Sequence, residues 1–143
     1  MPWRDITEQE AATLPEARLG GALLGAVVAA ALLFLVAAAG SLIAIDQLRA
    51  VGLRYMIPVG FVALWSAAFV VMTLLRLEAT PMVANVGLIA WLGWRLAAVL
   101  LSHAGWPLAV DLLGEIVLLA GFCGYMTAGV RPNAYYRRRL PVA

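Results

Sequence analysis

The sequence predicts an all-α integral membrane protein, an antiparallel four-transmembrane-helix bundle. Its 143 residues are 64% hydrophobic and only 13% charged, which lies far outside the usage of soluble domains. Four apolar stretches are long enough for helices that cross about 30 Å of hydrocarbon, which takes roughly 20 residues. These stretches are residues 19–45, 55–75, 81–103 and 107–129. Because the connections between them are short, neighbouring helices are expected to run antiparallel.

The expected organisation has three parts: an N-terminal segment (1–18), the four-helix transmembrane domain (19–129) and an Arg-rich tail (130–143). In the first part, Thr7 and Glu10 have the spacing of a capping box, which satisfies free amides at the start of a helix. The first span is not expected to be a cleaved signal peptide, because its apolar run is too long and its leader is acidic.

Orientation follows from the arginines, since positive residues near span ends are retained in the cytoplasm. All ten positive charges are Arg, and together with heavy Ala, Gly and Leu usage this indicates a GC-rich bacterial genome. Only Arg49 and Arg54 fall on the side opposite the termini. The other flanking arginines are Arg4, Arg18, Arg76, Arg131, Arg137, Arg138 and Arg139. We therefore expect a multi-pass protein of the bacterial inner membrane with both termini cytoplasmic.

The first span carries Gly21, Gly25 and Ala29 at small-xxx-small spacing. Small residues let helix backbones approach closely in lipid, where there is no hydrophobic drive between helices. This face is expected to pack tightly, either inside the bundle or against another protein.

The third span is expected to begin at Thr80-Pro81, an N-cap followed by proline. Within it, Trp91 and Arg95 are four residues apart and share one helix face. A turn at residues 102–107, with His103 at headgroup depth, is expected to join this span to the fourth.

Three charges inside the last two spans are the candidate functional site: Arg95, Asp111 and Glu115. Charged groups in a membrane are expensive, so they face inward and find partners. With the turn at Gly105, Arg95 and Glu115 are each ten residues from it and lie at one depth, about 15 Å below the turn. Asp111 is one helical turn nearer the outside on the same face as Glu115. The guanidinium is therefore expected to bind one carboxylate and touch the other.

Three interpretations of this cluster remain open. It locks the register of spans three and four, with one acid protonated. It relays protons or binds a cation through Asp111 or Glu115. Or one acid meets the charge of a partner subunit, which leaves Arg95 a single carboxylate.

The tail combines aromatic residues with arginines, namely Arg131, Tyr135, Tyr136, Arg137, Arg138 and Arg139. Each basic residue near an anionic leaflet is worth about 1 kcal/mol. We expect this tail to contact anionic membrane lipids or to dock a partner, and not to bind nucleic acid.

The end of the last span resembles a bacterial inner-membrane family of four-span proteins, domain of unknown function 2569. The resemblance rests on Tyr125, Gly129, Arg131 and Tyr136, spaced as in that family, and on Gly20-Gly21 before the first apolar run. Ala22 stands where the family has an aromatic residue. The resemblance implies a four-helix fold and no known activity.

Several machines need residues that this sequence lacks. A dihaem cytochrome needs two His pairs, whereas His103 is the single histidine, and a disulfide-forming enzyme needs paired cysteines, whereas Cys123 is alone. We expect no cofactor, no metal and no enzymatic activity. The preferred hypothesis is an accessory or assembly subunit of a larger membrane complex. The alternative is a small proton-coupled transporter or channel component that uses Asp111 and Glu115.

Overall fold

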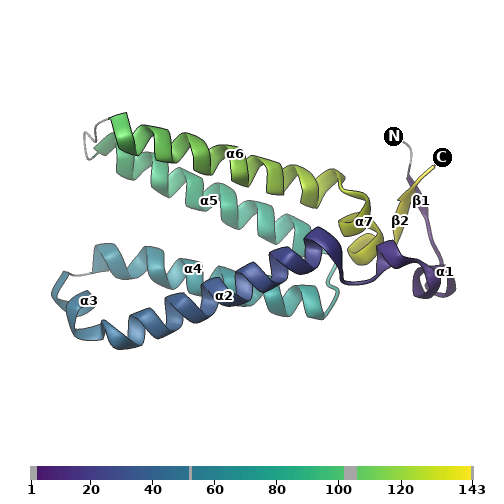
Figure 1. Ribbon diagram of the computed structural model, residues 1–143, viewed down its shortest axis with the longest axis horizontal. Coiled ribbons are helices and arrows are strands. Elements are labelled where there is room, and N and C mark those ends of the chain that lie inside the picture. The colour runs from purple at the N-terminus through teal and green to yellow at the C-terminus, as the bar shows by residue number, and fades with distance from the viewer. Residues whose placement is uncertain (1–2, 52, 102–105, 143) are drawn as a thin grey trace. The chain divides into compact units, whose positions relative to one another are not determined.

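The computed structural model describes residues 3–51, 53–101 and 106–142, and nearly all of them are helical. It confirms the predicted fold class, because four long apolar helices pack antiparallel in two pairs. The chain is a multi-span membrane protein that divides into two compact units, Leu19–Leu77 and Met1–Arg18 together with Glu78–Ala143. Figure 1 shows one helix pair in each unit.

The unit Leu19–Leu77 contains helices α2 (Gly21–Ile43), α3 (Ile45–Val51) and α4 (Leu53–Leu74). Helices α2 and α4 pack against each other, and the short helix α3 lies in the connection between them. The buried side chains of α2 recur every three or four residues, as expected for one helix face. They are Leu23, Val27 and Ala30.

The other unit is built on a hairpin of α5 (Thr80–Leu101) and α6 (Trp106–Ala128), which lie side by side in Figure 1. Helix α5 begins at Thr80, with Pro81 as its second residue, where the missing proline N–H costs no hydrogen bond. The predicted turn that contains His103 and Gly105 lies outside the described residues.

The two terminal segments, predicted as separate parts, fold together into what we call the terminal cap. It comprises β1 (Trp3–Asp5), α1 (Glu8–Thr13), the 3₁₀ helix η1 (Pro15–Ala17), α7 (Val130–Arg137) and β2 (Arg139–Pro141). Strand β1 pairs antiparallel with β2, with Arg4 opposite Leu140 (Figure 1). Because the two ends of the chain are hydrogen-bonded to each other, they share one side of the membrane.

Gly129 separates α6 from α7 and leads into the cap. A Cβ at this position would collide with the Tyr125 carbonyl oxygen and press on the Tyr125 ring, so the close approach requires glycine. Pro132 does not end a helix, although proline often does. Pro132 lies in the first turn of α7, where a proline is tolerated because that turn has free amides.

Candidate functional site: the intramembrane charge cluster

Helices α5 and α6 place the predicted pair at one level of the hairpin. Arg95 Nε donates to Glu115 Oε2 at 2.9 Å, which confirms that the guanidinium and this acid meet. A second polar contact, from Asn85 Nδ2 to the Cys123 carbonyl oxygen at 3.5 Å, joins the helices nearer the terminal cap. Both contacts fit one antiparallel register of α5 against α6.

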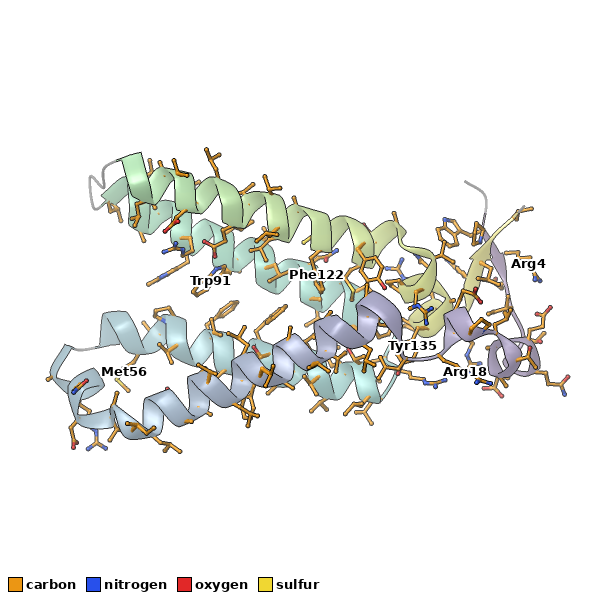
Figure 2. All side chains as sticks on the ribbon, viewed as in Figure 1. Arg4, Arg18, Met56, Trp91, Phe122 and Tyr135 are labelled. Carbon is orange, nitrogen blue, oxygen red and sulfur yellow. The ribbon has the colours of Figure 1, made fainter. Side chains whose placement is uncertain are left out.

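Trp91 completes the pair from one turn away on α5. Its indole Nε1 donates to Glu115 Oε1, so each carboxylate oxygen of Glu115 accepts a hydrogen bond from α5. Figure 2 shows Trp91 extending from the flank of this helix. The sequence placed Trp91 and Arg95 on one face but missed that they share an acceptor. The i, i+4 spacing of two donors opposite an acid was the available signal.

The Arg95–Glu115 pair is partly enclosed, with 30% of the Arg95 side chain and 24% of the Glu115 side chain exposed. Bringing two charges out of water carries a penalty of several kcal/mol per ion unless hydrogen bonds satisfy them. Here the carboxylate is satisfied at both oxygens, whereas the guanidinium uses its Nε. Chemically, this arrangement can hold an ionised acid within an apolar hairpin.

Asp111 does not join this pair, which corrects the expectation of one arginine between two carboxylates. Asp111 is exposed and forms no ion pair or hydrogen bond with the side chains that the structure describes. The reason is its level: Asp111 precedes Glu115 on α6 by four residues, one helical turn or about 6 Å. Arg95 presents its Nε to Glu115, the acid at its own level.

Within the unit Leu19–Leu77, the small-residue face of α2 is open. Gly21, Gly25 and Ala29 are exposed, and no atom lies within 4 Å of the place where a Gly25 Cβ would be. Close packing at Gly25 is therefore absent among the described residues of this unit. Contact of this face with another protein, the second expectation, stays a prediction.

The tail residues are divided between the interior and the surface of the terminal cap. Tyr135 and Tyr136 are buried, at 6% and 3% exposure, and their rings meet edge to face at 5.0 Å. In Figure 2, Tyr135 lies at the same end of the α5–α6 hairpin as Arg4. The two tyrosines therefore build the cap, and the arginines remain the tail's polar surface.

The arginines of the tail also hold the N-terminal segment. Arg138 forms an ion pair with Glu8 and Arg139 with Asp5, each at 2.8 Å. Arg131 Nη1 donates to the carbonyl oxygens of Pro15 and Arg18, at 2.9 and 3.1 Å. Arg137 Nη1 donates to Asn133 Oδ1 at 3.2 Å.

Asn133 is a structural residue that the sequence analysis missed. It is 4% exposed, and its Nδ2 donates to the carbonyl oxygens of Thr127 and Gly129, at 3.0 and 2.9 Å. Thr127 lies in the last turn of α6, where helical partners run out, and Gly129 lies in the junction between α6 and α7. An asparagine just past a glycine helix end is the signal that could have indicated this cap.

The predicted capping box of the first segment is confirmed. Thr7 Oγ1 accepts from the Glu10 backbone N–H at 3.3 Å, and the Thr7 backbone N–H donates to Glu10 Oε2 at 2.9 Å. This backbone hydrogen bond, assisted by Arg4, lowers the pKa of the Glu10 carboxyl.

Comparison with known proteins gives no match to a family model, to a curated protein or to a solved structure. The four spans agree with the architecture that the family resemblance implied, and the family itself stays a prediction. Within the described ranges, no group of His, Cys, Asp and Glu side chains is placed to hold a metal ion.

Proposed function

We propose that this small multi-span membrane protein is a non-enzymatic accessory subunit that stabilises or helps to assemble a larger complex of the bacterial inner membrane. The observation that carries the proposal is the doubly hydrogen-bonded Glu115 carboxylate. Both of its oxygens accept from α5 donors, which suits a fixed contact between helices better than a group that exchanges protons. The charge pair then fixes the register of α5 against α6, a role that we call a register lock.

The open face of α2 supports a helical partner. With Gly21, Gly25 and Ala29 exposed, a partner helix has room to approach the backbone closely. In this proposal the face receives a transmembrane helix of the larger complex.

The terminal cap gives the proposed subunit an ordered surface on one side of the membrane. With cytoplasmic termini, the exposed Arg138 and Arg139 side chains lie where anionic lipid headgroups attract basic residues. The likeness to domain of unknown function 2569 agrees with this proposal, because that resemblance implies four helices and no known activity.

Purification from native membranes in mild detergent tests the assignment. We expect the wild-type chain to co-purify with a larger membrane complex and Gly25→Leu to lose it, since leucine blocks close approach. Gly60→Leu is the matched control, because Gly60 of α4 is also exposed with no atom within 4 Å of a Cβ. A wild-type chain that elutes alone and monodisperse refutes the accessory role. If both variants lose the complex equally, the small-residue face of α2 is not the interface.

The second candidate is a proton-coupled transporter or channel component, and it is favoured by the exposed acid at Asp111. In this case Asp111 and Glu115 carry the proton. Reconstituted vesicles with a pH-sensitive dye distinguish the two functions. If the wild-type protein conducts protons and Asp111→Asn does not, while the fold is unchanged, the transport function is supported. If the wild-type flux does not exceed that of protein-free vesicles, the transport function is eliminated.

A further inference from the structure

Two charged groups on the α5–α6 hairpin still have unused binding capacity. Asp111 is exposed and has no partner among the described side chains. Arg95 uses Nε for Glu115, and its two terminal amino groups donate no hydrogen bond within the described part of the chain. One acceptor and several donors thus remain on neighbouring levels of one hairpin.

Their order along the hairpin is defined. Arg95 contacts Glu115, and Asp111 precedes Glu115 on α6 by four residues, or about 6 Å along the helix. The hairpin therefore presents an acid nearer the end where α6 begins and a base roughly 6 Å farther from that end. A ligand that satisfies both must carry its positive group outermost and its negative group beneath.

We propose that Arg95 and Asp111 form a binding site for the headgroup of a phospholipid with a primary ammonium, a phosphatidylethanolamine. Its phosphate binds the free amino groups of Arg95, and its ammonium binds the Asp111 carboxylate. The lipid belongs to the leaflet at the end of the hairpin farthest from the terminal cap. This site is separate from the subunit role proposed above.

The chemistry of both groups fits this occupant. A guanidinium binds phosphate through paired N–H groups, and an ammonium offers several donors to one carboxylate. The Arg95 side chain is 30% exposed, so a ligand can reach it from the hairpin surface. A charge at this depth also draws water and headgroups inward by thinning the bilayer locally. Trp94, 42% exposed and adjacent in sequence, adds an indole of the kind favoured near headgroups.

Native mass spectrometry of the purified full chain in detergent tests the site by titration with phosphatidylethanolamine, phosphatidylcholine or phosphatidylglycerol of identical acyl chains. We expect phosphatidylethanolamine to bind roughly tenfold more tightly than phosphatidylcholine, whose methylated ammonium has no N–H to donate. Hydrogen bonds between charged groups support a ratio of that size. Equal binding of these two lipids, or tighter binding of phosphatidylglycerol, would overturn the proposal.

Variants assign the preference to its residues. Asp111→Asn should reduce the preference to about twofold or less, whereas Asp111→Glu should retain it. Asp46→Asn is the matched control, because Asp46 on α3 is an exposed acid at 94% side-chain exposure. Arg95→Lys keeps a cation for Glu115 but removes the free amino groups of the guanidinium. It should therefore weaken the binding of all three lipids. Circular dichroism checks the fold of each variant. A preference that survives in Asp111→Asn, or that is lost in Asp46→Asn, would refute the assignment.

Discussion

Removing both partners of the Arg95–Glu115 pair should destabilise the hairpin far less than the sum of the two single removals. Glu115→Gln leaves a guanidinium without its counter-ion, and Arg95→Gln leaves the opposite uncompensated charge. In the double variant both charges are gone, and two neutral amides face each other. The comparison therefore measures the ion pair rather than the individual side chains.

The expected magnitude follows from the geometry of the pair. Breaking a buried pair costs about 3–5 kcal/mol, and an unpaired charge in a transmembrane helix costs about 2.5–3.5 kcal/mol on insertion scales. Because the side chains are 30% and 24% exposed, we take the lower end, about 2.5 kcal/mol for each single variant. With about 2 kcal/mol for the double variant, the coupling energy is about 3 kcal/mol.

Reversible unfolding in mixed micelles, followed by tryptophan fluorescence, gives the free energies of the wild type and three variants. Trp91→Phe is a useful reference, because it removes one donor to Glu115 and leaves both charges. Interhelical hydrogen bonds in membranes average about 0.6 kcal/mol, so its effect should be much smaller. A coupling energy below about 0.5 kcal/mol would show that the charges stabilise the hairpin independently, and the register-lock interpretation would fail.

Three further predictions concern the terminal cap. Gly129→Ala should destabilise the junction by at least about 1 kcal/mol, because the new Cβ meets the Tyr125 carbonyl; thermal unfolding measures this, and an unchanged midpoint would contradict it. Tyr136→Ala should cost about 3 kcal/mol and expose the cap to proteolysis, since the side chain is 3% exposed; undiminished protease resistance would count against it. The pKa of Glu10 is lowered by the Thr7 backbone N–H, so the capping contribution is complete above about pH 4.5 and lost as pH falls through the lowered pKa; amide exchange in α1 should rise in that range, and pH-independent protection would refute this.

Most of the transmembrane architecture could be predicted because hydrophobic length is a local property of the sequence. The predicted first span, 19–45, and α2, Gly21–Ile43, differ by two residues at each end. The Arg95–Glu115 contact was also predictable, since an antiparallel hairpin with a short turn fixes which residues share a level. The expected second contact, with Asp111, does not form, because Asp111 lies one helical turn from the level at which Arg95 meets Glu115.

The terminal cap could not be predicted from the sequence, for a physical reason. Its contacts join residues at opposite ends of the chain, such as Arg139 with Asp5, 134 positions apart. Local patterns identified the Thr7–Glu10 capping box but carry no information on which distant strand pairs with β1. Basic and aromatic residues beside a membrane span also fit lipid contact equally well, so the burial of Tyr135 and Tyr136 became evident only from the fold.

Polar contacts, and not apolar packing, should determine the register of α5 and α6. Only 6% of the α6 span is buried, and lipid tails replace apolar neighbours without loss, so sliding one helix along the other changes little apolar burial. In Arg95→Leu combined with Glu115→Leu, we therefore expect both helices to remain inserted while their register becomes heterogeneous. Spin labels at the native Cys123 and at Leu100→Cys, an exposed position, measure this as a broadened distance distribution. A distribution as narrow as that of the labelled parent would mean that side-chain shape alone sets the register.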